Sequence, residues 1–171
     1  MDQRHSLLSE ISLNMSLEKG LPNTNDGCWR SSFRYNTAEW LYQELYALLD
    51  QSVKFYLEHH PSYRNALSPQ GLQVDQWTNV NNPGSINRLH THSTYDFVGL
   101  YYIQATGTGE LTFHNPANLM QECNVNSPSV SRMSYTPIDG DLVLWPAWMP
   151  HEVELNKSDK QRINIAFNIK L

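Results

Sequence analysis

Cysteine and charge are both scarce in this sequence, and each shortage excludes a class of protein. Cys28 and Cys123 are the only cysteines, and the chain shows no charged-then-apolar leader, so neither a disulfide framework nor a secretory signal is indicated. Charged residues make up 17% and the formal net charge is -5, so no basic face is available for a phosphate backbone. We therefore expect a cytoplasmic protein without a nucleic-acid partner. An anionic small molecule would need a local positive group, not a global field.

Long hydrophobic runs are also lacking. Apolar stretches are interrupted within a few residues and the mean hydropathy is negative, so we expect no membrane-spanning helix and no membrane partner. A length of 171 residues suits one domain, residues 1–171, that buries its core without disulfides. A homodimer of this domain is compatible with the sequence.

The first third of the chain predicts one helix. Residues 1–35 mix Ser, Asn, Gly and Pro without a sustained period, and we expect them to form an N-terminal arm along a sheet edge. Residues 36–60 are expected to hold a supporting helix, capped by Asn36 or Thr37 and ended by Pro61. Its apolar positions recur at helical spacing: Trp40, Leu41, Leu45, Leu48, Leu49, Val53 and Tyr56.

The remainder of the chain, residues 72–171, predicts a mainly β unit. Its short segments are rich in β-branched and aromatic residues and separated by Gly, Pro, Asn or Ser turns: 72–80, 97–105, 110–113, 141–145, 153–155 and 163–170. Residues 115–137 are expected to be a long insertion between strands, of the kind that often forms a lid or substrate loop. The sequence thus predicts a helix packed on an all-β core.

Three histidines are candidate metal ligands. Residues two apart on a strand point to one face, so the imidazoles of His90 and His92 can converge. His151 follows an apolar strand that ends in a Pro-rich corner, where side chains can meet at a barrel mouth. Facial sites for non-haem iron use two histidines and a carboxylate, but imidazole also suits zinc, copper and nickel, so the residues alone do not name the metal. The other histidines that we considered are expected to be packing or surface residues: His5, His59, His60 and His114.

Arg162 is the candidate anion-binding residue. A turn at residues 156–159 would pair Leu155 with Lys160 and set Arg162 opposite Val153, on the face of His151. Arg162 also begins an otherwise apolar strand. Its guanidinium could bind a carboxylate through two parallel hydrogen bonds, which a lysine cannot do.

Residues 77–171 resemble the 2-oxoglutarate and Fe(II)-dependent oxygenases, specifically the small bacterial and phage branch related to prolyl hydroxylases. The order and spacing of six stretches together carry the resemblance. They are Asn79-Val80-Asn81-Asn82-Pro83-Gly84, His90-Thr91-His92, Gly99-Leu100-Tyr101-Tyr102-Ile103, Gly109-Glu110-Leu111-Thr112-Phe113, Trp145-Pro146-Ala147-Trp148-Met149-Pro150-His151-Glu152-Val153 and Arg162-Ile163-Asn164-Ile165-Ala166-Phe167-Asn168. The fold implied is a double-stranded β-helix, the jelly-roll core shared with cupins.

The resemblance also implies an activity and residue roles. The activity is hydroxylation of an unactivated C–H bond of a small-molecule or peptidyl substrate. Fe(II) would be the cofactor, 2-oxoglutarate and O2 would be consumed, and succinate and CO2 would be released. His90 and His151 would bind iron, while Arg162 and Tyr102 would hold the distal carboxylate of 2-oxoglutarate. Trp145, Trp148 and Asn164 are expected to line the pocket.

His92 departs from the family pattern, which has an aspartate or glutamate at that position. Asp96, four residues further on, shares the strand parity of His92 if the strand runs straight, and could supply the oxygen ligand. Three arrangements therefore stay open: His90, His92 and His151; two histidines with Asp96; or two histidines with water.

Two other functions stay open for the same reason. The histidines and their preceding glycines, Gly84 and Gly140, also approximate the two cupin signatures, and a three-histidine cupin would resemble thiol dioxygenases, which need no 2-oxoglutarate. A binding module that keeps the fold without productive iron is the other alternative. Arg162 and Tyr102 favour the oxygenase, because a thiol dioxygenase has no reason to place a carboxylate fork on that strand.

Overall fold

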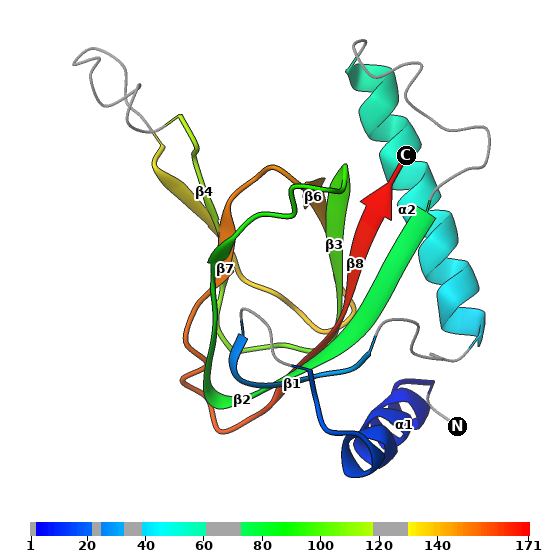
Figure 1. Ribbon diagram of the computed structural model, residues 1–171, viewed down its shortest axis with the longest axis vertical. Coiled ribbons are helices and arrows are strands. Elements are labelled where there is room, and N and C mark those ends of the chain that lie inside the picture. The colour runs from blue at the N-terminus through cyan, green and yellow to red at the C-terminus, as the bar shows by residue number, and fades with distance from the viewer. Residues whose placement is uncertain (1–2, 22–24, 33–38, 61–72, 118–129) are drawn as a thin grey trace.

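The computed structural model describes residues 3–21, 25–32, 39–60, 73–117 and 130–171 (Figure 1). Within these residues, two helices and eight strands follow one another. They are α1 (Gln3–Leu17), β1 (Asn25–Arg30), α2 (Glu39–His59), β2 (Gln73–His90), β3 (Phe97–Gln104), β4 (Leu111–His114), β5 (Arg132–Tyr135), β6 (Leu142–Pro146), β7 (His151–Val153) and β8 (Arg162–Lys170).

The strands form one curled antiparallel sheet. Its order is β5-β4-β7-β2-β8-β3-β6, and β1 pairs with β2 off this path. The long strand β2 pairs with β8 over Gln73 to Asn81 and with β7 over Asn87 to His90, so its two halves have different neighbours. Figure 1 shows the strands wrapped around a common interior, with both helices outside it. The expected fold class, a mainly β double-stranded β-helix with a flanking helix, is confirmed.

Alternation along β8 separates the two sides of the sheet. Side chains of a strand point alternately to opposite faces, and Ile163, Ile165, Phe167 and Ile169 join the cluster that contains buried residues of both helices. Ala166 belongs instead to a second cluster, with Trp77, Leu100 and Tyr102. Arg162, Asn164 and Asn168 share the parity of Ala166 and are buried. One face of β8 therefore holds the helices, and the other lines the interior of the barrel.

Helix α2 forms as the spacing of its apolar residues predicts. The described side chains of Leu49, Val53 and Leu57 are 4% exposed or less and pack on the outer face of β8 and β3. Residues 36–38, where the cap was expected, lie outside the described part of the chain. As Figure 1 shows, α2 runs along the outside of the sheet.

The prediction for residues 1–35 was wrong in one part. Residues 3–17 form helix α1, which buries Leu7 and Ile11 but leaves Leu13 and Leu17 largely exposed. A buried stripe of two residues, one turn apart, is too short to produce a recognisable period. The arm does lie along a strand, however, because β1 pairs with β2 in the register Arg30 to Asn79 and Cys28 to Asn81.

Two segments outside the expected strands contain strand. Asn81-Asn82-Pro83-Gly84 lies within β2, where Gly84 has φ +81° and the chain exchanges β8 for β7 as its neighbour. The expected insertion at 115–137 includes β5, which pairs with β4, and its residues 118–129 lie outside the described part of the chain.

The expected pairing of Arg162 with Val153 is also wrong. Strand β2 lies between β7 and β8, so that Val153 pairs with Asn87 and Arg162 pairs with Asn81. The segment at 156–161 therefore crosses over β2 and is not a hairpin turn. Within the described residues, no helix is long and apolar enough to cross a membrane.

Gly109 is expected to tolerate no side chain. It has φ +103°, and an added Cβ would lie 2.9 Å from the carbonyl oxygen of Glu154. Gly107 has φ +80° and open space around it, so Gly107→Ala incurs only the cost of the left-handed backbone, about 1 kcal/mol. We expect Gly109→Ala to lose roughly 1–3 kcal/mol more in urea unfolding, because the clash displaces main chain. Equal losses in the two variants would show that the segment after β7 yields freely.

Candidate metal centre and cavity

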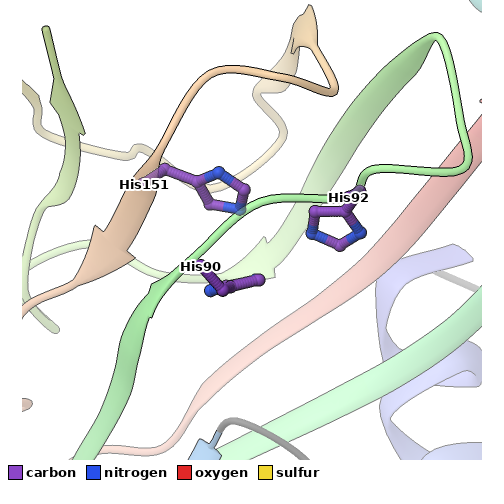
Figure 2. A group of neighbouring side chains, drawn as sticks. All are labelled: His90, His92 and His151. Atoms are coloured by element: carbon purple, nitrogen blue, oxygen red, sulfur yellow. The ribbon is translucent and has the colours of Figure 1, made fainter. Parts of the chain in front are cut away.

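Three imidazoles meet at the open end of the barrel. His90 ends β2, His151 begins β7 directly opposite it in the register, and His92 follows two residues after β2. The ring centroids lie 4.3 Å apart for His90 and His151, 5.0 Å for His90 and His92, and 5.3 Å for His92 and His151. Their potential ligand atoms all lie within 4.8 Å of one another. Figure 2 shows the three rings turned towards a common point.

Main-chain carbonyls fix the orientation of two of these rings. His90 Nδ1 lies 2.7 Å from the carbonyl oxygen of Arg88, and His151 Nδ1 lies 2.9 Å from that of Met149. A carbonyl oxygen can only accept, so both Nδ1 atoms carry the proton and both Nε2 atoms keep a free lone pair. The Trp145 indole N–H, 3.3 Å from the same His151 Nδ1, then packs on the ring without bonding to it. Such second partners are typical of metal-binding histidines.

Burial keeps all three rings neutral. Desolvation lowers the pKa of His90 below its ordinary value of 6.5, against the contact with the Arg88 carbonyl, which raises it. Desolvation, followed by the charge of His90, lowers the pKa of His92 to about 4. Desolvation lowers the pKa of His151 to about 3, although its contact with Met149 opposes the shift. Neutral imidazole is the form that binds a metal, so the site is prepared for one at neutral pH.

The metal-free protein is expected to lose stability on acidification below pH 6.5. The unfolded chain takes up protons there, whereas the folded His92 and His151 stay neutral until pH about 4 and about 3. The unfolded state binds more protons in this range. The free energy of unfolding therefore decreases as the pH is lowered, by about 1.4 kcal/mol per pH unit for His151 alone. Urea unfolding in a chelator at pH 7.0, 6.0 and 5.0 measures the slope. His151→Gln should have a shallower slope, and an identical slope would contradict the burial of a neutral His151.

Asp96 is not brought to the three histidines. It lies in the turn before β3, where its carboxylate accepts the Leu171 amide at 2.9 Å and its own amide donates to Ile169. Among the described residues, the group of potential ligands contains the three histidines alone. His114 is bonded to Glu152, and His59 to the Phe55 carbonyl. The structure therefore favours the three-histidine arrangement over the one with Asp96.

A cavity of about 400 Å³ opens next to the histidines. Its apolar wall includes Val98, Leu100, Leu111 and Ala166, and its polar wall comprises Arg30, Asn79, Asn87, Asn168 and the three histidines. Trp145 lines it as expected. Trp148, at 54% exposure, does not, and lies instead beside a smaller pocket with Asp96.

Asn164 was expected to line the cavity but does not. It is buried and accepts a hydrogen bond of 3.1 Å from Asn79.

Two residues that line the cavity carry no sequence signal that we recognised. Arg30 and Trp77 were not expected in the site, and they enter it because β1 pairs with β2. An arginine at the end of an irregular-looking segment is indistinguishable from a surface arginine unless that pairing is known.

Unpartnered polar atoms gather below the cavity. Arg162 is 1% exposed, and within the described residues its Nε and Nη1 have no hydrogen-bond partner; the same holds for the Tyr102 hydroxyl and Asn81 Nδ2. These three side chains lie on adjacent strands, since Arg162 pairs with Asn81, and Tyr102 with Asn164. Desolvation raises the pKa of Tyr102, against the opposing charge of Arg162, so the phenol is a donor at neutral pH.

This donor set fits a small carboxylate. A buried guanidinium with two nitrogens left unpaired is costly, and an anion that accepts two parallel N–H bonds would relieve that cost. The phenol and the Asn81 amide add further donors. Three neutral imidazoles at the open end and a cationic donor cluster within the barrel together suit a metal ion and an anionic molecule that carries a second carboxylate.

The comparisons with known proteins agree with this donor set. Residues 75–168 match the family described as "Putative 2OG-Fe(II) oxygenase". No curated protein matches the chain.

Solved structures with similar folds are numerous. A prolyl-4-hydroxylase from Pseudomonas putida has a TM-score of 0.67 at 15% identity, with 99% of this chain and 86% of that one covered. HygX from Streptomyces hygroscopicus, solved with nickel and 2-oxoglutarate bound, has a TM-score of 0.55 at 13% identity, with 94% and 77% covered. At these identities the likeness shows the fold alone.

Proposed function

Because the chain belongs to the 2OG-Fe(II) oxygenase family, we propose that it is a 2-oxoglutarate-dependent non-haem iron dioxygenase that hydroxylates an unactivated C–H bond. Succinate and CO2 are the co-products of this reaction. One observation carries the proposal: Arg162, buried at 1% exposure with Nε and Nη1 unpartnered within the described residues, lies on the interior face of β8 in the same barrel as the three histidines. A site for metal alone would have no use for this guanidinium.

His90, His92 and His151 would hold the iron. Three protein ligands leave positions open for 2-oxoglutarate and O2. Bound iron, with 2-oxoglutarate as the electron donor, supplies the oxidising chemistry, and the protein supplies binding and orientation. The carbonyls of Arg88 and Met149 hold Nδ1 of His90 and His151 and leave both Nε2 atoms free to bind a metal.

Arg162 and Tyr102 would orient the co-substrate. The guanidinium would bind the distal carboxylate in a fork, and the protonated phenol would donate to the same group. Trp145, Phe113 and Leu100, which are buried in the inner cluster, would keep water from the reacting atoms. The cavity volume suits a small molecule or one residue of a peptide.

Anaerobic titration of metal-free protein with Fe(II) and 2-oxoglutarate tests the proposal. We expect a visible charge-transfer band only when protein, Fe(II) and 2-oxoglutarate are all present. Iron binding without that band would favour the three-histidine dioxygenase that needs no 2-oxoglutarate. Absence of iron binding would favour the non-catalytic module. The two Arg162 nitrogens without a partner among the described residues support the first result, because neither alternative requires a carboxylate receptor there.

A further inference from the structure

A second, smaller pocket adjoins the metal centre. It has a volume of about 110 Å³, against about 400 Å³ for the main cavity, and His92 lines both. A buried water needs roughly 10–15 Å³, so the pocket admits a small chemical group but not a whole substrate. Its aromatic walls come from four residues: Tyr56, Tyr95, Phe97 and Trp148. A group held in this aromatic pocket would lie beside a candidate metal ligand.

Asp96 gives the aromatic pocket a negative charge. Among the described residues that line the pocket, Asp96 is the only Asp or Glu, and there is no Lys or Arg. Its Oδ2 accepts the Leu171 amide at 2.9 Å, but a carboxylate offers about four acceptor sites, so this bond fixes the side chain and leaves others for a ligand. Arg30 lines the main cavity and not this pocket. The local charge therefore favours a cation.

Main-chain hydrogen bonds hold the walls of the aromatic pocket together. Ala147 donates to the carbonyl oxygen of Asp96 at 2.9 Å and accepts from the amide of His92 at 3.0 Å. Asp96 also donates its amide to Ile169 of β8 at 2.9 Å. Because Trp148 directly follows Ala147, the segment that carries this indole is fixed against the segment that carries His92 and Asp96. The pocket is thus preformed, between the two chain segments that supply the metal ligands.

The aromatic side chains determine which cation fits. The face of an aromatic ring attracts a cation, and Trp attracts it most strongly. Trp148 is 54% exposed, whereas Phe97 is 4% exposed and packs edge-to-face on Tyr56 at 5.0 Å. A metal ion needs several oxygen, nitrogen or sulfur ligands, but the walls of this pocket are largely carbon. An organic ammonium group suits one carboxylate among aromatic rings better than a second metal ion does.

We infer that the aromatic pocket binds an ammonium group of the substrate, so that the substrate is an organic amine with its nitrogen protonated or methylated. This inference rests on the proposed function and names the substrate class of that site. The remainder of the substrate would extend past His92 into the main cavity, because His92 lines both spaces. The net charge of -5 favours the approach of such a cation.

Titration with matched probes tests the inference. Protein loaded anaerobically with Fe(II) and 2-oxoglutarate, and metal-free protein in a chelator, are each titrated with choline and with dimethylbutanol, the neutral analogue that has carbon in place of nitrogen. Butylammonium and butanol form a second pair, with an unmethylated ammonium group. We expect the cation of at least one pair to bind about tenfold more tightly than its neutral partner, because only the cation gains from the carboxylate and the ring faces. The pair with the larger ratio identifies the type of ammonium.

Variants assign the preference to the aromatic pocket. Asp96→Asn keeps an oxygen for the Leu171 amide but loses the charge, and should lower the ratio about threefold. Trp148→Leu should lower it by a similar factor, whereas Trp148→Phe should keep most of it. The double variant of Asp96→Asn and Trp148→Leu should bring the ratio close to one. Asp159→Asn removes an exposed carboxylate that does not line the pocket and should keep the native ratio.

Two results would overturn the inference directly. One is equal binding within both pairs to the native protein, and the other is an unchanged ratio in the double variant. Loss of iron binding in Asp96→Asn would also overturn it, by assigning Asp96 to the metal.

The same titrations separate this inference from the proposed function. If the native protein does not bind 2-oxoglutarate, yet the metal-free protein prefers the cations in a manner that depends on Asp96 and Trp148, the co-substrate proposal fails and the ammonium site stands. If 2-oxoglutarate binds and the preference is absent, only the substrate class fails.

Discussion

Arg162→Met is expected to weaken 2-oxoglutarate binding about a hundredfold while Fe(II) binding stays nearly intact. Removing one partner of a buried, hydrogen-bonded charge pair costs about 2–5 kcal/mol, and each 1.4 kcal/mol is a factor of ten. Arg162 lies on β8 and contributes no ligand atom to the histidine group. The visible band of the ternary complex measures 2-oxoglutarate binding, and titration with Fe(II) alone measures the metal site.

The same substitution is expected to leave the metal-free protein at least as stable as the native protein. Arg162 is 1% exposed, with Nε and Nη1 unpartnered within the described residues, and replacing buried ionic groups by apolar ones of similar size is often neutral or stabilising. Urea unfolding in a chelator measures this. Loss of binding without loss of stability would separate a binding role from a packing role.

Two further variants control for charge and shape. Arg162→Lys keeps the charge but loses the fork, so its 2-oxoglutarate affinity should fall between those of the native protein and Arg162→Met. Arg132→Met removes an exposed arginine of β5 and should change neither binding nor stability. Native 2-oxoglutarate affinity in Arg162→Met would remove Arg162 from the co-substrate site.

Local spacing was sufficient for a mainly β unit with a flanking helix and for the histidine pair, while the double-stranded β-helix itself was implied by the family resemblance. Alternation along residues 163–170 reflects a strand with helices on one face and the barrel interior on the other, and the structure places Ile163 and Ile165 on the helix face. Of the apolar positions expected in α2, Leu49 and Val53 lie on its buried face, whereas Leu48 is 47% exposed. His90 and His92 lie at one strand end, and both lie close to His151. These features depend on neighbours in sequence or on a general property of strand ends, so sequence carries them.

Long-range pairing was not accessible in the same way. The register of Arg162 was assigned from the turn at 156–159, but β2 comes between β7 and β8. Arg30 was overlooked because its place in the cavity depends on β1 pairing with β2, nearly fifty residues further on. Helix α1 was overlooked because only Leu7 and Ile11 are deeply buried. In each case the decisive contact joins segments that are distant in sequence, and periodicity within a segment does not describe such contacts.

His151→Ala is expected to abolish measurable Fe(II) binding. Loss of a residue that merely orients a ligand costs about 10- to 100-fold in metal affinity, so loss of a ligand from a set of three should exceed the upper end of that range. The imidazole is 3% exposed and its Nδ1 is held by the Met149 carbonyl, so solvent cannot readily supply a replacement in the same position. Metal content after equilibrium dialysis against Fe(II) under anaerobic conditions gives the measurement.

The control for His151→Ala is a histidine variant on the neighbouring strand β4. His114→Ala removes a histidine of β4 that is bonded to Glu152 and lies outside the ligand group, so it should retain full metal content. Because His151 is buried, near-UV circular dichroism of the metal-free variant must match the native spectrum, and His90→Ala, at a less buried position, should lose iron in the same way. Full iron occupancy in His151→Ala would exclude it from the ligands.

Substitutions of His92 distinguish whether this residue binds the metal or only occupies the position of a ligand. If His92 binds the ion, His92→Ala should lose most Fe(II) affinity and His92→Asp should recover part of it, because a carboxylate restores the two-histidine, one-carboxylate set that suits non-haem iron. Unchanged iron affinity in His92→Ala would instead leave two histidines and water at the metal.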